Sequence, residues 1–226
     1  TLASDGTAGT VLLDPRDLTI STAGNTASNI NNGTLQGLLA SNNTIISTVD
    51  AGGVDAGNIL VRDRVSWNSA FSLSLLAEGD VYIADDIGNR GTGNINIVAG
   101  WDSVGAPLST IAGPSTGNID MDTAIFDTAF FGKGGSGSIY VGTTDAGVTG
   151  ALRTATVGSR AGQTNFAGHD VHVLGGVQST GENQFSQIGY DHEEISNSYT
   201  DAVTGRIRVQ ANNDVILRGS EVGGSL

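Results

Sequence analysis

The sequence predicts an all-β fold, a right-handed parallel β-helix that forms one elongated domain over residues 1–226. Three Gly-Asn-Ile tripeptides each open a short run of alternating apolar residues, and two variants with another middle residue do the same. These five tripeptides begin at Gly57, Gly93, Gly117, Gly137 and Gly205. A turn residue followed by an alternating strand, repeated irregularly about every 20 to 36 residues, is typical of a chain that winds its strands into a solenoid.

The composition supports this class and excludes several partners. The chain has 34 Gly and no Cys. Glycine is the usual residue at tight corners, so its abundance indicates many turns. Ten basic residues against 23 acidic residues give a net charge of -13, which repels nucleic-acid phosphates and anionic lipid headgroups. No apolar stretch approaches the roughly 20 residues of a membrane-spanning helix. We therefore expect neither a nucleic-acid partner nor a membrane span.

Short alternating segments predict strands along most of the chain. They are residues 10–13, 18–20, 44–49, 59–61, 73–77, 81–83, 95–99, 119–121, 139–141, 155–157, 171–174, 185–188, 207–209 and 215–217. At about 20 residues a coil, the chain would form about ten coils in a shaft of roughly 50 Å. Irregular loops are expected near residues 21–34, 101–117, 142–154 and 190–204. The best candidate for a helical turn is residues 35–40, where three leucines have helical spacing around Gly37.

Alternate residues of each strand should face a common core. The expected core residues are Ile95, Ile97, Leu75, Val81, Ile83, Val171, Val173 and Ile207. Replacing Ile97 by Asp should then destabilise the protein, because a charge would enter the core without a partner. The same pattern predicts a far-UV circular dichroism spectrum of mainly β type, with less than about a tenth helix.

A second repeat joins two strands through a turn that contains Asn or Asp. It occurs at residues 38–45, 75–83 and 209–217, and more loosely at 166–173. Asn and Asp tolerate left-handed backbone and bond to nearby main chain, so they suit corners. When one corner recurs coil after coil, we expect its side chains to form hydrogen-bonded ladders.

Several segments resemble a known family. Residues 10–20, 76–83 and 93–102 resemble the shaft of filamentous-haemagglutinin-type exoproteins, the adhesins of two-partner secretion, and residues 167–176 and 187–190 are similar. The resemblance implies a bacterial protein that is secreted or displayed on the cell surface after export through a partner outer-membrane transporter. It implies a non-enzymatic role in adhesion, aggregation or biofilm, with a host or polysaccharide surface as ligand. The Asn-Pro signature of the N-terminal secretion domain is missing, which implies a downstream shaft segment.

Two alternatives come from other functional classes. Asp85-Asp86, Gly168-His169 and Arg206-Ile207-Arg208 occur in the order of the polygalacturonase signatures, and that chemistry needs two carboxylates flanking the scissile bond. Asp86 and His169 are 83 positions apart, several coils rather than neighbouring ones, which argues against the enzyme. A carbohydrate-binding module would use exposed rings, although such aromatics more often cover a solenoid core. The candidate rings are Trp67, Trp101, Phe130, Phe131 and Tyr140.

The sequence predicts no catalytic, cofactor-binding or metal-binding residues. His169 and His172 are three apart in an expected strand and should point to opposite faces, which is poor ligand geometry. His192 with its two following glutamates lacks the second histidine of a zinc-protease motif. Residues 134–141 imitate a calcium-binding nonapeptide but place Ile139 where its aspartate should be.

The two ends of the expected solenoid show no capping helix. The chain begins with the polar residues 1–9 and finishes with a Gly-rich segment after Leu217. An uncapped β-helix exposes unpaired backbone donors and acceptors at its ends. We therefore expect end-to-end contacts that produce a homo-oligomer or fibre.

Overall fold

The computed structural model describes residues 10–13, 16–48, 56–101, 136–143, 154–175, 185–190 and 202–218. Within these residues 47% lie in strands and 6% in a helix, and every strand pairing is parallel. The expected all-β class with parallel sheets is therefore confirmed, as is the low helix content.

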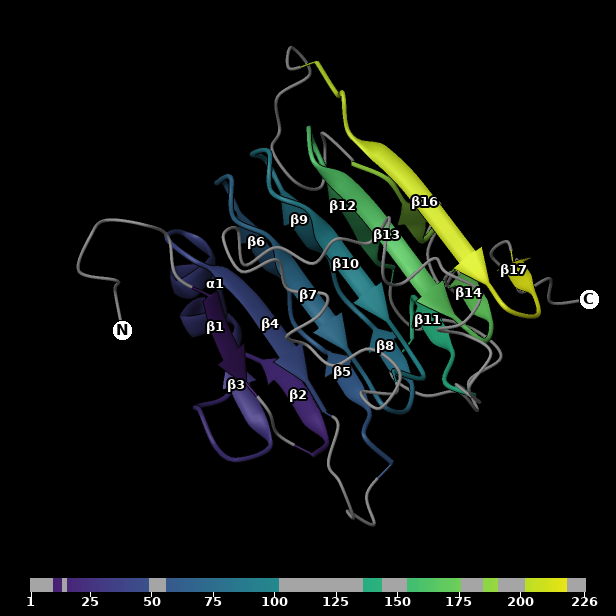
Figure 1. Ribbon diagram of the computed structural model, residues 1–226, viewed down its shortest axis with the longest axis horizontal. Helices are drawn as coiled ribbons and strands as arrows, with labels where there is room; N and C mark the ends of the chain where they lie inside the picture. The colour runs from purple at the N-terminus through teal and green to yellow at the C-terminus, as the bar shows by residue number, and fades with distance from the viewer. Residues whose placement is uncertain are drawn as a thin grey trace, which may run out of the picture.

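The strands form three sheets, shown in Figure 1. Sheet A contains, in spatial order, β1 (Thr10–Leu13), β4 (Asn43–Ser47), β7 (Leu73–Leu76), β10 (Ile95–Val98), β13 (Gln163–Gly168) and β16 (Arg206–Ala211). Sheet B contains β17 (Val215–Arg218), β14 (Val171–Leu174), β11 (Ile139–Val141), β8 (Val81–Ile83), β5 (Ile59–Val61), β2 (Leu18–Ser21) and β3 (Asn29–Asn31). Sheet C contains β15 (Gln187–Ile188), β12 (Thr156–Ser159), β9 (Ile87–Asn89) and β6 (Val65–Trp67).

The order of the strands along the chain is regular. From β4 onward, successive described strands belong to sheets A, B and C in turn, and from β7 onward each pairs with the strand three places earlier. Thus β7 pairs with β4, β8 with β5, and β9 with β6. We call three consecutive strands from sheets A, B and C a rung, for example β7, β8 and β9.

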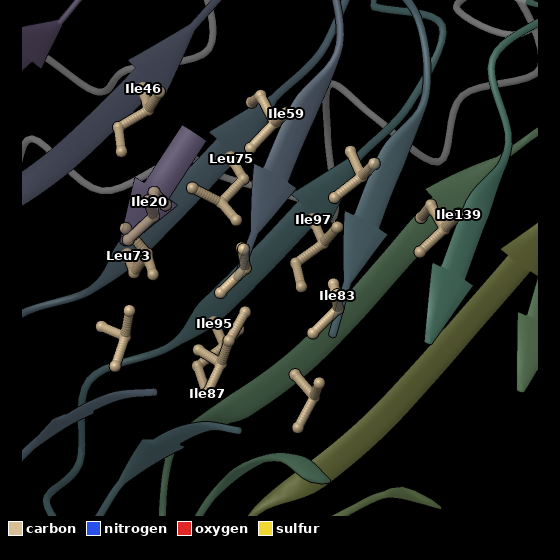
Figure 2. Close-up of a cluster of buried hydrophobic side chains, with 14 of the residues drawn as sticks. Ile20, Ile46, Ile59, Leu73, Leu75, Ile83, Ile87, Ile95, Ile97 and Ile139 are labelled. Atoms are coloured by element: carbon tan, nitrogen blue, oxygen red, sulfur yellow. The ribbon is translucent and has the colours of Figure 1, made fainter. Parts of the chain in front are cut away.

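Inward-facing apolar side chains stack from rung to rung between the sheets (Figure 2). In sheet A one column runs through Ile46, Leu75, Ile97 and Phe166, all fully buried. Seven of the eight expected core residues are buried: Leu75, Val81, Ile83, Ile95, Ile97, Val171 and Val173. Ile207 is 54% exposed, so its prediction is wrong. The reason is its position in β16, the last strand of sheet A in the described chain, where no further described strand lies beside it.

The expected number of coils is too high. Sheet A has six strands in the described part of the chain. Leu73 and Ile95 are register partners 22 residues apart, whereas Ile95 and its next partner Thr164 are separated by 69 residues. The described residues therefore form fewer rungs than expected. The expected strand at residues 119–121 lies outside the described residues.

Four strands are missing from the expected strand segments, and one of them, β13, is covered only from residue 166 by the looser copy of the second repeat. β3 lies inside the segment expected to be a loop, and β6 and β9 have three residues each. In β9 the inward position after Ile87 is the polar Asn89, so this strand has no apolar alternation. β3 and β9 each have a single apolar inward position, which periodicity cannot distinguish from a loop. β6 alternates, with Val65 and Trp67 both buried, but three residues are too few to define a period.

The expected helical turn is a helix, α1 (Asn32–Leu39). The Asn31 side chain caps its start by accepting a hydrogen bond from the Thr34 N–H at 3.2 Å. Leu35 and Leu39 are buried, and α1 packs against β6, the edge strand of sheet C. The helix therefore covers the N-terminal end of the core, and the expectation that neither end carries a capping helix is wrong there.

Polar side chains at the corners form the expected ladders. A side-chain oxygen at or just before the start of a strand accepts a hydrogen bond from the backbone N–H at the same place in the next rung. At sheet A the acceptor and donor pairs are Asn43 and Ser72 (2.9 Å), Ser72 and Asn94 (2.8 Å), and Asn94 and Gln163 (2.8 Å). At sheet B they are Asp17 and Asn58 (2.6 Å), Asn58 and Asp80 (2.8 Å), and Asp80 and Ser138 (2.7 Å). These residues therefore join rung to rung without any ligand.

Asn89 is the most heavily bonded corner residue of the described chain, and we expect Asn89→Ala to destabilise the fold. Its amide donates to the Ser69 and Gly93 carbonyls at 3.1 and 2.9 Å, and its oxygen accepts from the Gly91 N–H at 2.9 Å. The same oxygen accepts from the Ser69 N–H at 3.3 Å. Because Asn89 is fully buried, alanine would remove this acceptor from the Gly91 and Ser69 N–H groups, at a cost of about 2 kcal/mol or more. Urea denaturation measures the loss. The exposed Asn213→Ala is the control, and an equal effect of the two changes would contradict this role.

Candidate functional site

The outer face of sheet B carries a column of stacked rings, which we call the aromatic stripe: Tyr82, Tyr140 and His172. These residues occupy the same register position in β8, β11 and β14. The ring centroids of Tyr82 and Tyr140 lie 5.2 Å apart with an interplanar angle of 11°, and those of Tyr140 and His172 lie 4.5 Å apart at 17°. All three side chains are half-buried. The stripe is thus a continuous stack of rings across three neighbouring strands.

Carboxylates at the start of the sheet B strands flank the stripe. Asp80 accepts the Tyr82 hydroxyl at 2.7 Å with one oxygen and the Ser138 N–H with the other. Asp170 accepts the Asn213 amide at 2.9 Å and the Asp214 N–H at 3.0 Å. Both carboxylates therefore have structural hydrogen bonds.

These contacts shift two pKa values. Burial raises the pKa of Tyr140 above its usual 10.0, and the negative charges of Asp80 and Asp170 raise it further. A hydrogen bond with Ser138 acts in the opposite direction and lowers this pKa, but the net shift is upward. Desolvation also raises the pKa of Asp170. Its hydrogen bonds from Asn213 and Asp214, with the nearby His169 and His172, nevertheless hold that pKa below the usual 3.8. The local field thus favours a neutral tyrosine beside an ionised carboxylate.

We expect Tyr140 to titrate above pH 10.0 in the folded protein. A folded-state pKa above the unfolded value means that its contribution to stability is complete below pH 10.0 and is lost as the pH rises through the higher folded value. The difference in near-ultraviolet absorbance between wild type and Tyr140→Phe isolates this titration from the other tyrosines. Asp80→Asn should lower the midpoint because it removes a negative charge, and a wild-type midpoint at or below 10.0 would contradict the assignment.

The stripe is poorly suited to stacking on sugars. A sugar packs against a free ring face, and Tyr140 has a ring on each of its faces. Trp67 and Trp101 are buried, and the Trp67 indole donates to the Phe71 carbonyl at 2.9 Å. The structural interpretation of both tryptophans is therefore confirmed. Phe130 and Phe131 lie outside the described residues.

The polygalacturonase-like residues are not brought together. Asp86 lies just before β9 in sheet C, and one of its oxygens accepts the Thr156 N–H at 2.8 Å. His169 lies at the corner between β13 of sheet A and β14 of sheet B. Arg206 and Arg208 belong to β16 at the edge of sheet A. The residues thus occupy different sheets and corners, and Asp86 serves as a corner acceptor.

The histidines differ in position from the expectation in one respect. The chain turns at His169, so His169 and His172 do not share a strand. Only His172 belongs to the aromatic stripe. Among the described residues no group of three or more His, Asp or Glu side chains could hold a metal ion. His192, Glu193 and Glu194 lie outside those residues. Ile139, at the place of the calcium-ligand aspartate, is a core residue.

Sequence reasoning missed the stripe, although a signal was present. Val81-Tyr82-Ile83, Ile139-Tyr140-Val141 and Val171-His172-Val173 each place a ring between two β-branched residues. Aligning these three triplets would have placed the rings in one column.

The chain matches no protein-family model, no curated protein and no solved structure. In the part of the chain that the structure describes, no helix has the length and apolarity to cross a membrane.

Proposed function

We propose that the chain is a right-handed parallel β-helix that serves as a non-enzymatic shaft segment of a secreted or surface-displayed bacterial protein. The observation that carries the proposal is the regular A, B, C order of the described strands, in which each strand from β7 onward pairs with the one three places earlier. Connections between parallel strands of one sheet are right-handed in nearly all proteins, which supports the handedness.

The side chains support a structural role. The side-chain oxygens of the corner residues accept hydrogen bonds from the backbone of the next rung. The rings of the aromatic stripe pack on one another. Side chains that elsewhere serve catalysis or binding thus hold rung to rung here. Stability built from neighbour-to-neighbour contacts is the property of a solenoid, which can be lengthened to make a shaft.

The biological setting rests on the resemblance to filamentous-haemagglutinin-type exoproteins. Under this proposal the shaft is exported through a partner outer-membrane transporter and acts in adhesion, aggregation or biofilm. The resembling segments 76–83 and 93–102 contain β8 and β10, which lie in the middle of sheets B and A. The resemblance therefore concerns the repeated unit of the shaft.

Deletion of one rung tests the shaft. Residues 73–94 contain β7, β8 and β9. Because Leu73 and Ile95 are register partners, the deletion lets β10 take the place of β7 beside β4 in the same register. We expect this variant to fold with an unchanged type of circular dichroism spectrum. Deletion of residues 84–94 is the control, because it removes only β9 and breaks the A, B, C order. It should unfold despite removing fewer residues, and the opposite outcome would contradict the solenoid.

Display on a non-adherent bacterium tests the biological role. Cells that carry the wild-type chain or the one-rung deletion should aggregate or adhere more than cells that carry the 84–94 deletion. Equal behaviour of all three would contradict an adhesive shaft. Release of reducing ends from polygalacturonate, abolished by Asp86→Asn, would instead establish the enzyme.

A further inference from the structure

The exposed large hydrophobic side chains of the described residues gather at one end of the molecule. All five belong to the C-terminal edge strands or to residues near them in sequence: Phe185, Val203, Ile207, Val215 and Leu217. β16 and β17 are the last strands of sheets A and B, and Figure 1 shows them at the end opposite α1. This apolar surface, which we call the C-terminal end face, is therefore a continuation of the core.

The register shows that these side chains are the ends of core columns. Val215 stacks on Val171 and Leu217 on Val173, and both partners are buried. Val215 and Leu217 are themselves 53% and 75% exposed. Among the described residues, β16 pairs along one side only, with β13, so no described strand occupies its other edge. Such an edge is a template for an added strand.

The opposite end does not match this face. There β3 pairs beyond β2 in sheet B, and α1 takes the place beside β6 in sheet C. The inward residues Leu18 and Ile30 are buried. A head-to-tail copy would therefore place β3 and α1 where further rungs of sheets B and C should start. The strand edges at the two ends therefore do not match in the way that continuous pairing of one copy with the next requires.

Charge also argues against two C-terminal end faces meeting. Arg206, Arg208 and Arg218 are exposed on β16 and β17. Three of the chain's 10 basic residues thus lie on these two strands, in a chain whose net charge is -13. Along β16 the arginines alternate with the inward Ile207 and Val209. A symmetric dimer would bring these arginines toward their own copies, at an electrostatic cost.

We propose that the open edge of β16 binds an extended acidic segment of another protein by strand addition. Alternate apolar residues of the segment cover Ile207 and Val209, and the acidic residues between them pair with Arg206 and Arg208. The main chain gives the segment its hydrogen bonds, and the two alternating sets of side chains give it selectivity. This inference needs only the described edge and does not depend on the adhesive role.

A labelled peptide of alternating aspartate and valine, blocked at both termini, tests the proposal by fluorescence anisotropy with the full chain. We expect saturable binding and protection of the β16 amides from hydrogen exchange. The Arg206→Glu/Arg208→Glu variant should bind this peptide at least tenfold more weakly and should prefer a lysine-valine peptide. Raised salt should weaken wild-type binding. The matched control is Arg16→Glu/Arg90→Glu, which makes the same charge change at exposed sites on other rungs and should bind like wild type.

Three results would overturn the proposal. They are no saturable binding of the acidic peptide, equal affinity of the wild type for the acidic and basic peptides, and equal weakening by the two double variants. Sedimentation velocity of the chain with and without the peptide shows whether the chain forms a dimer. A dimer through the C-terminal end face that the peptide fails to dissociate would assign the edge to a second copy.

Discussion

Ile97→Asp is expected to lose about 4 kcal/mol or more of unfolding free energy, enough to unfold much of the protein. Ile97 lies between Leu75 and Phe166 in a core column, and all three side chains are fully buried. An aspartate there would place a carboxylate among apolar groups without a partner, so it would be desolvated or forced to take up a proton. Urea denaturation followed by circular dichroism measures the loss.

Ile207→Asp is the matched control for this change. Ile207 faces the same side of sheet A as Ile97, but it belongs to the edge strand β16 and is 54% exposed. Its replacement should cost less than about 1 kcal/mol, because water still reaches the carboxylate. Equal losses from the two variants would mean that the inward columns are not the core. Wild-type stability of Ile97→Asp would have the same meaning.

Much of this fold could be predicted because most strands carry two apolar inward positions. Val81 and Ile83 in β8, and Ile139 and Val141 in β11, give the alternation that periodicity recognises. The same reasoning fails at β9, where Asn89 takes an inward position to bond the following turn. Polar corners that replace apolar residues are therefore the places where the sequence pattern is weakest.

Sheet membership and register could not be predicted in the same way. The strands of sheets A and B have similar apolar patterns, and the chain between partner strands varies from the 22 residues that separate Leu73 and Ile95 to the 69 that separate Ile95 and Thr164. Without a fixed repeat length, no spacing rule brings Tyr140 beside His172. The C-terminal end face depends on this register and appears only in the structure, whereas the aromatic stripe also has a sequence signal in its three ring-centred triplets.

The glycines of the Gly-X-Ile repeat have a physical reason in the packing of neighbouring rungs. A Cβ atom on Gly93 would fall on the Phe71 carbonyl oxygen, and one on Gly137 would fall on the Gly79 carbonyl oxygen. The obstacle is backbone in both cases, which cannot turn aside as a flexible side chain can. Glycine at these positions therefore lets one rung approach the next closely enough for the strand after it to pair.

Gly93→Ala is accordingly expected to cost about 3 kcal/mol or more, because the two rungs must separate locally to admit one methyl group. The Phe71 carbonyl that would move also accepts the Trp67 indole N–H, so tryptophan fluorescence should change along with the unfolding midpoint. Gly37→Ala is the control. Gly37 lies exposed in α1 with no atom in the way of a Cβ, and alanine there should stabilise the protein by about 0.5–1 kcal/mol through helix propensity. If Gly93→Ala were as stable as wild type, the close contact between rungs at this corner would be wrong, and the glycine would need another explanation.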